Sequence, residues 1–200
     1  KIPFKNFCEK NNIPTSPWKI IKTLGKVEKF GFPCVLKDSA GGSSREVIIL
    51  KSKEDLSQAK KLLKLSSKFL VEKFLPGIEI TVGILDNKAL PVLEIVPPEG
   101  KWFDYRYKYS GETKEILNAP SIIEGERKLA QKYALEIHQK LSLGSYSRSD
   151  FIVHQGIPYA LEVNTIPGWT PESLFPKSAK AAGFNFEQLV EKLINLALEK

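Results

Sequence analysis

The sequence contains no methionine and only two cysteines among its 200 residues. Because an initiator Met is missing, we expect the chain to be part of a longer protein. Cys8 and Cys34 stand in unrelated contexts without metal-ligand spacing, which fits a reducing, cytoplasmic compartment better than a disulfide framework. No apolar run approaches ~18 residues, and no charged-then-apolar N-terminus indicates a secretion signal, so the sequence predicts neither a membrane span nor export.

Arginine is also scarce, although the net charge is +7. Only four arginines are present, and every other basic residue except the two histidines is lysine. Because Arg is the residue that clamps phosphates in a fork and reads base edges, scattered Lys indicates a solvated surface rather than a nucleic-acid interface. A smaller anion such as a nucleoside triphosphate remains open. The 42% apolar content suffices for one large domain or two small lobes.

The apolar patterns mix helical and strand periods and predict an α+β fold. Hairpin turns are predicted at Asp86-Asn87 and Gln155-Gly156, and residues 98–120 show no period, which is typical of a functional or mobile connection between two lobes. Helices are predicted at 3–11, 53–65, 122–141 and 186–199, and strands at 32–37, 46–50, 69–74, 80–85, 90–96, 150–154 and 157–164. The two longest helices are predicted to pack through Leu129, Tyr133, Ile137 and Leu141, and through Leu189, Val190, Leu193, Ile194 and Ala197.

The last predicted hairpin carries carboxylates. Residues two apart on a strand share a face, so Glu162 and Asn164 point one way and Leu161 and Val163 point into a core. A loop of about three residues places Asp150 opposite Glu162, where cross-strand Cβ atoms lie roughly 4.5–5.5 Å apart. Such carboxylates repel unless a cation lies between them, and oxygen ligands suit Mg²⁺, which commonly also binds phosphates. Ordinary strand-entry and surface positions explain these residues equally well.

A second feature points to phosphate. Lys37 ends the apolar run FPCVLK, where a solvated lysine has little structural reason to be, and DSAGGSS follows it. Backbone N–H groups of such a loop can surround phosphate oxygens, although the sequence contains no G-x-x-x-x-G-K-[ST] motif and most Gly-Ser loops are plain turns. The loop and the hairpin together favour a metal-bound nucleotide.

Several long blocks in a fixed order resemble the ATP-grasp domain of D-alanine–D-alanine ligases, from Lys1 to the final helix. The most specific block is RSDFIVHQGIPYALEVNTIPGWTPESLFPKSAKAAGFNFEQLV, and LVEKFLPGIEITVGIL, FDYRYKY and KDSAGGSS match as well. The resemblance implies an ATP-grasp fold of two lobes, each an antiparallel sheet with helices, at about 1–75 and 76–200, with ATP held between them. It also implies an N-terminal substrate domain that this chain lacks.

The resemblance implies a role for each matching residue in binding ATP and metal. Phosphates are held by two lysines under a serine lid, adenine is read by the segment after a strand, and the ribose is bound by an acid. The implied ATP-binding residues are Lys1, Lys37, Ser43, Ser44, Glu72, Lys73, Phe74, Leu75, Glu79, Phe103 and Lys108. The implied ligands of two Mg²⁺ (or Mn²⁺) ions are Asp150, Glu162 and Asn164, with Glu162 bridging.

The implied reaction forms D-alanyl-D-alanine for peptidoglycan synthesis. One D-alanine carboxylate takes the γ-phosphoryl group as an acyl phosphate, and the amine of a second D-alanine attacks it. The implied catalytic residues are Arg148, Gly168, Lys108 and Tyr109, and the implied substrate-binding residues are Tyr105, Tyr109, Arg148, Gly168, Ser173 and Leu174. The implied partners are small molecules, D-alanine and ATP, with no nucleic acid and no membrane, and relatives suggest a homodimer for the full-length protein.

The match has departures and alternatives. Asp38 stands where the family usually has proline, Arg45 and Glu46 follow the serine loop, and Ser145 replaces a glycine. Another ATP-grasp ligase, joining a carboxylate to an amine or a hydroxyl such as that of D-lactate, is the second hypothesis. A nucleotide-binding module is the third, and the aromatic-basic run could also stack single-stranded bases. We expect the 200-residue chain not to ligate alone.

Overall fold

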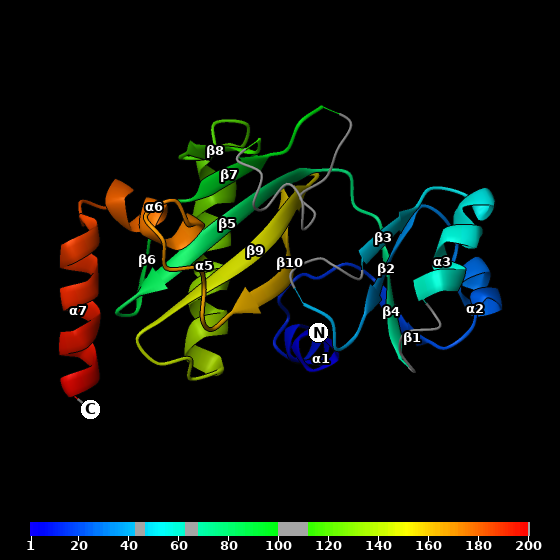
Figure 1. Cartoon of the computed structure of the whole chain (residues 1–200), viewed down its shortest axis with the longest axis horizontal. Helices are drawn as coiled ribbons and strands as arrows, with labels where there is room; N and C mark the ends of the chain where they lie inside the picture. The colour runs from blue at the N-terminus through cyan, green and yellow to red at the C-terminus, as the bar shows by residue number, and fades with distance from the viewer. Residues whose placement is uncertain (43–46, 63–67, 100–111, 200) are drawn as a thin grey trace. The chain divides into compact units, whose positions relative to one another are not determined.

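The structure is a computed structural model, and it describes residues 1–42, 47–62, 68–99 and 112–199. The described residues form two compact units (Figure 1). The first unit is Lys1–Pro76 with the described part of Pro97–Thr113, and the second is Gly77–Val96 with the described part of Lys114–Lys200. In the described part of the chain, no helix is long and apolar enough to cross a membrane.

The first unit is built on a four-stranded antiparallel sheet. Its strands, in spatial order, are β1 (Trp18–Ile21), β4 (Phe69–Lys73), β2 (Cys34–Asp38) and β3 (Val47–Leu50). Helices α2 (Leu24–Phe30) and α3 (Leu56–Leu62, after the 3₁₀ turn Lys53–Asp55) pack side by side against it (Figure 1). The buried core contains Ile21, Val27, Cys34, Leu36, Leu50, Ala59, Phe69 and Val71. Helix α1 (Ile2–Lys10) completes the unit.

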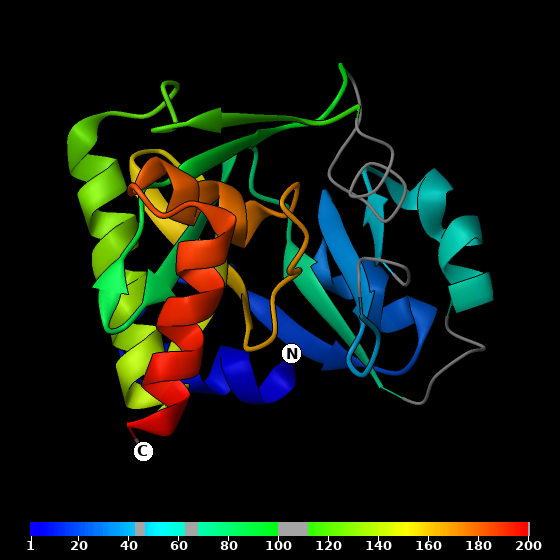
Figure 2. The same ribbon diagram turned by 60° about the vertical axis from the view of Figure 1, so that its left-hand side comes forward.

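The second unit contains a larger sheet. Its path is β10 (Ile157–Asn164), β9 (Tyr146–His154), β5 (Ile78–Leu85), β7 (Leu93–Val96) and β8 (Lys114–Leu117), with β6 (Lys88–Ala89) paired to β5. Helix α5 (Glu124–Lys140) packs on one face, and in Figure 1 the strands pass in front of it. Helix α6 (Leu174–Ala181) packs on β5, and Figure 2 shows α7 (Phe186–Leu198) alongside it.

Side-chain contacts show which strand residues face α5 and which face α6. His138 of α5 contacts Ser147 through Nδ1 and Oγ at 2.8 Å, so Ser147 faces α5. A Cβ added to Gly83 would lie 3.1 Å from the Phe175 ring of α6. Because strand residues alternate between faces and Gly83 pairs with Arg148, Arg148 faces α6.

Most predicted helices and strands are confirmed near their predicted bounds, including the hairpin turns, where Asp86, Asn87 and Gln155 adopt φ values near +50°. At the start of the 3₁₀ turn, Asp55 Oδ2 accepts a hydrogen bond from the Ser52 N–H at 3.2 Å. The prediction that 98–120 is irregular throughout is wrong, because β8 lies inside that stretch and pairs with β7. Strand β1 and helix α2 were not predicted from the sequence.

The predicted apolar stripes are only partly correct. Of the four residues predicted for α5, only Ile137 is buried, and the other buried positions are Ala130, Ala134 and His138. Small side chains allow α5 to approach the sheet closely, so its buried stripe lies one position later than the large residues suggest. On α7 only Leu189 is buried, while Val190 and Ile194 are exposed.

Candidate active site

The predicted register of the carboxylate hairpin is confirmed, but its cause differs. Glu162 pairs with Asp150, while the turn has two residues, Gln155 and Gly156, rather than three. A two-residue turn alone would bring Leu161 opposite Asp150. A bulge between Ala160 and Glu162 adds one residue to β10 and restores the pair. Because a one-residue slip moves a side chain to the other face, the bulge places Glu162 on the Asp150 face.

The bulge therefore completes a polar row across three strands. Thr81 of β5 pairs directly with Asp150 of β9, which pairs with Glu162 of β10. Two residues along the strands, on the same face, Asn164 pairs with Arg148. All five residues lie on the α6 face of the sheet. Leu161 and Val163, which were expected to point into a core, are partly buried, and Val163 pairs with the fully buried Ser149 on the opposite face.

Asp150 is the most constrained member of this row. Its Oδ1 accepts hydrogen bonds from Thr81 Oγ1 at 2.6 Å and Arg148 Nε at 2.9 Å. Its Oδ2 accepts from an Arg148 terminal nitrogen at 2.9 Å and Asn164 Nδ2 at 3.2 Å. Burial acts to lower the pKa of Arg148, but the Asp150 carboxylate, with Glu162 and Glu79 nearby, raises it. The guanidinium therefore stays charged and rigidly held.

The donor set fits one kind of metal. Among the described residues, no group of three or more His, Cys, Asp or Glu side chains could hold an ion. Asp150, Glu162 and Asn164 offer two carboxylates and an amide, all oxygen donors. Mg²⁺ is commonly bound by one or two carboxylates, with phosphates and waters filling the other positions. These residues fit a phosphate-bound Mg²⁺ and not a zinc centre.

The loop after β10 brings Gly168 and Ser173 together. Ser173 is the N-cap of α6, and its Oγ accepts a hydrogen bond from the Thr170 N–H at 3.2 Å. A Cβ added to Gly168 would lie only 2.7 Å from that Oγ. Leu174, the first residue of α6, is 7% exposed. The first N–H groups of a helix favour anions, so this terminus can hold a carboxylate.

In the first unit, Lys37 belongs to a buried ionic cluster. Lys37 Nζ lies 2.9 Å from Glu72 Oε1, and Lys5 Nζ lies 2.6 Å from Glu72 Oε2. Ser16 Oγ also donates to Oε2, at 2.7 Å. Burial alone would raise the pKa of Glu72, but the two ammonium groups and the hydrogen bonds hold it at about 2. Glu72 is therefore ionised at neutral pH.

Other predicted ATP residues of this unit occupy the ends of the sheet and its loops. Lys1 Nζ donates to the Gly41 carbonyl in the glycine loop. The N–H groups of Lys73 and Phe74 donate to Pro17 O and Pro33 O, so these two donors are occupied within the fold. Asp38 accepts from the Ala40 N–H at 3.0 Å, which ties the unexpected carboxylate to its own loop.

The remaining predicted residues divide into two groups. Glu79 lies in the second unit, on β5 between Ile95 and Ile152. Six predicted residues lie outside the described part of the chain: Ser43, Ser44, Phe103, Tyr105, Lys108 and Tyr109. Sequence reasoning missed Thr81 and Lys5. Lys5 could have been noticed, because it stands three residues before Cys8 on the apolar face of α1.

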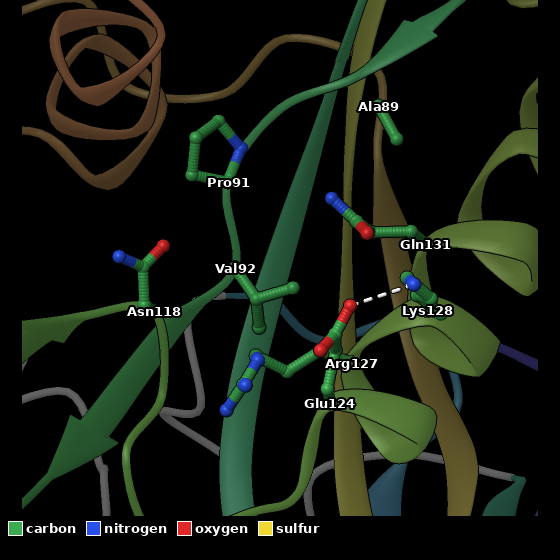
Figure 3. A pocket seen from close by; sticks show the side chains of 8 residues that line it. All are labelled: Ala89, Pro91, Val92, Asn118, Glu124, Arg127, Lys128 and Gln131. Atoms are coloured by element: carbon green, nitrogen blue, oxygen red, sulfur yellow. Dashed lines mark ion pairs between the residues drawn. The ribbon is translucent and has the colours of Figure 1, made fainter.

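One pocket, of about 270 Å³, lies away from these residues (Figure 3). It is lined by Ala89, Pro91, Val92, Asn118, Glu124, Arg127, Lys128 and Gln131. Glu124 and Lys128 pair with each other at 2.6 Å, and Arg127 donates to the Ile122 carbonyl at 2.6 Å. Its charged groups are thus occupied within the fold, and it contains none of the predicted site residues.

Comparison with known proteins identifies the family. The family described as "D-ala D-ala ligase C-terminus" matches residues 2–195. The chain belongs to this family. Its sequence is 36% identical over 208 aligned residues to the D-alanine–D-alanine ligase of Maridesulfovibrio salexigens, covering 100% of this chain and 68% of that protein. It is 42% identical to the ligase of Methylacidiphilum infernorum, covering 96% of this chain and 64% of that protein.

Solved structures of the same family show the same fold. The Bacillus anthracis D-alanine–D-alanine ligase complexed with ATP is 31% identical, with a TM-score of 0.80, over 98% of this chain and 64% of that one. A second structure of that ligase gives 33% identity and a TM-score of 0.81. The predicted α+β ATP-grasp fold is therefore confirmed. The chain spans about two thirds of the length of these ligases.

Proposed function

We propose that the protein containing this chain is an ATP- and Mg²⁺-dependent ligase that joins two D-alanines, for peptidoglycan synthesis in the cytoplasm. The observation that carries the proposal is the polar row of Asp150, Glu162, Arg148 and Asn164 on one face of the second unit's sheet. Metal-binding oxygens and a fixed guanidinium stand side by side there. A module that only bound nucleotide would have no need for the guanidinium.

Each unit, taken by itself, carries residues suited to part of a nucleotide. In the first unit, Lys37 and Lys1 supply ammonium groups to its phosphates, and the backbone of 72–75 meets the adenine. In the second unit, the Glu79 carboxylate is suited to accept hydrogen bonds from ribose hydroxyls, and Asp150 and Glu162 would hold Mg²⁺, which would neutralise charge on the phosphates. This follows from donor chemistry, since oxygen ligands and ammonium groups suit a magnesium–phosphate complex.

Residues of the second unit take part in orienting the amino acids. The Leu174 N–H at the start of α6 attracts the carboxylate of the accepting D-alanine beside Ser173, because the Ser173 N–H already donates to the Thr170 carbonyl. The Arg148 guanidinium and the Gly168 N–H stabilise the oxyanion that forms at the attacked carbonyl. When bound, Mg·ATP supplies the phosphoryl group that activates the first D-alanine carboxylate; the second D-alanine's amine then displaces phosphate, leaving ADP, phosphate and dipeptide.

Three finer points extend the proposal. The acceptor is D-alanine rather than D-lactate, as the family name of the relatives suggests, and a panel of amino and hydroxy acids in an ADP-release assay tests this. The full-length protein acts as a homodimer on small molecules, which sedimentation of that protein tests. Residues 1–200 alone do not ligate, because relatives are about half as long again.

One variant tests the central claim. Glu162→Gln in the full-length protein keeps the shape of the side chain but removes the negative charge of the carboxylate that is proposed to bind the metal. We expect D-alanine-dependent ADP formation to fall at least about 100-fold, since a metal supplies several kcal/mol of charge stabilisation. Glu191→Gln, on an exposed position of α7, is the matched control and keeps full activity. Unchanged ADP formation in Glu162→Gln would contradict the proposed metal site.

A further inference from the structure

Lys5 is a buried lysine that the proposed function does not use. It lies on α1 and is 1% exposed. Its Nζ contacts Glu72 Oε2 at 2.6 Å, Thr15 Oγ1 at 2.6 Å and Ser16 Oγ at 3.3 Å. Burial lowers the pKa of Lys5, an effect that the Glu72 carboxylate opposes. Because removing an ammonium group from water costs several kcal/mol, a buried lysine here calls for a specific reason.

The charge balance of the cluster supplies that reason. Lys5 and Lys37 approach different oxygens of one carboxylate, Glu72 Oε2 and Oε1. Two positive groups therefore share one negative group, and one positive charge is left over. The Lys5 side chain is 1% exposed and that of Lys37 is 15% exposed, so the excess charge can meet a ligand only through Lys37.

A cluster without Lys5 would behave differently. Lys37 and Glu72 alone would form a neutral pair, and a neutral pair attracts phosphate weakly. With Lys5 and Ser16 occupying Oε2, the carboxylate is compensated from its buried side. The Oε1 contact then orients the Lys37 ammonium without cancelling its charge.

We propose that Lys5 is a positioning residue for nucleotide binding, which compensates Glu72 and so keeps the charge of Lys37 available to the phosphates of ATP. The inference rests on the proposed function, because Lys37 must meet a nucleotide phosphate for Lys5 to matter. It differs from a purely structural role, in which Lys5 only fastens α1 to β4 and the charge on Lys37 is irrelevant.

Charge-restoring variants separate these two roles. Mg·ATP binding to the full-length protein is measured by isothermal titration calorimetry for the wild type, Lys5→Met, Lys5→Gln and the double variant Lys5→Met/Glu72→Gln. The single variants remove one positive charge from the cluster, and the double variant restores the original net charge with Lys37 unchanged. Lys10→Met, at the exposed end of α1, removes the same formal charge away from the cluster and is the control.

We expect Lys5→Met and Lys5→Gln to weaken Mg·ATP binding about 10- to 100-fold, the effect of losing one charge-assisted contact. Lys10→Met binds as the wild type does, and the double variant recovers most of the lost affinity. Lys5→Gln keeps a donor toward Glu72, so it reports on charge even if Lys5→Met does not fold.

Three results would overturn the inference. Wild-type affinity in a folded Lys5→Gln variant would show that the charge of Lys5 is not needed. A double variant that binds as weakly as Lys5→Met, or more weakly, would show that Lys5 acts only through the fold. A wild-type protein that binds no Mg·ATP would overturn the proposed function itself, and the role of Lys5 with it.

Discussion

Thr81 Oγ1 donates a 2.6 Å hydrogen bond to Asp150 Oδ1 from the directly paired position on the neighbouring strand. Thr81 is 1% exposed and Asp150 is 5% exposed, so water does not replace this contact readily. The hydroxyl fixes one carboxylate oxygen while Arg148 and Asn164 reach both. Outer contacts of this kind orient a ligand before the metal arrives.

Thr81→Val removes the hydroxyl and keeps the shape of the side chain. We expect the concentration of Mg²⁺ that half-saturates ADP formation to rise about 10-fold, because outer-contact substitutions typically weaken metal affinity by that order. Mn²⁺ binding followed by electron paramagnetic resonance checks the affinity without catalysis. Thr23→Val, at an exposed position whose side chain makes no capping bond, serves as control. A Mn²⁺ affinity equal to that of the wild type would show that Thr81 only fills space.

Gly168→Ala tests the substrate loop. Its Cβ would lie 2.7 Å from Ser173 Oγ, so the Ser173 side chain must move from its contact with Thr170. We expect the KM for the accepting D-alanine to rise about 10-fold or more, since misplacement by 1 Å can cost 10²-fold in rate, while the affinity for ATP is unchanged. Gly125→Ala, whose Cβ would find only Ile123 at 4.0 Å, is the matched control. An unchanged KM would separate Gly168 from the acceptor site.

The local sequence pattern predicted that polar residues line the hairpin, but it did not predict the turn length and the bulge that set the strand register. The spacing of Glu162 and Asn164 gave their shared face and Gln155-Gly156 marked the turn, while the length of that turn and the compensating bulge at Leu161 left no local signal. The turn is one residue shorter than predicted and the bulge adds one residue to β10, so the two differences cancel and the Asp150–Glu162 pair was predicted correctly. Thr81 and Lys5 were missed because their partners, Asp150 and Glu72, are 69 and 67 residues away in sequence. Such contacts depend on strand pairing and helix docking, which a single sequence does not display.

The ionisation of Glu72 makes the free energy of unfolding depend on pH. Its pKa falls from 4.5 to about 2 on folding, so the stabilisation is fully present above pH 4.5 and is lost as the pH falls towards 2. The shift corresponds to on the order of 3 kcal/mol in the free energy of unfolding. Urea unfolding at a series of pH values checks this. Glu72→Gln should be less stable at pH 7 and should change less between pH 5 and 2, whereas the exposed Glu191→Gln should follow the wild type. Parallel curves for all three would contradict the assignment.

The protonation of His138 should change the free energy of unfolding at a higher pH than the protonation of Glu72 does. It is 1% exposed, with Nδ1 2.8 Å from Ser147 Oγ and Nε2 3.1 Å from Gly144 O. Because a carbonyl only accepts, Nε2 carries the hydrogen, and Nδ1 of the neutral ring accepts from the serine hydroxyl. Burial lowers the pKa of His138, and the Gly144 carbonyl opposes this only in part.

The sign of the effect follows from that shift. The unfolded chain takes up a proton near pH 6.5, while the folded chain resists it, so stability is lost as the pH falls below about 6.5. We expect wild-type unfolding free energy to decline between pH 7.5 and 5.5, and His138→Gln to decline less from a lower starting value. His154→Gln, on the half-exposed end of β9, should keep the wild-type slope. A wild-type curve that is flat over this range would show that His138 is protonated as readily in the folded chain as in the unfolded one.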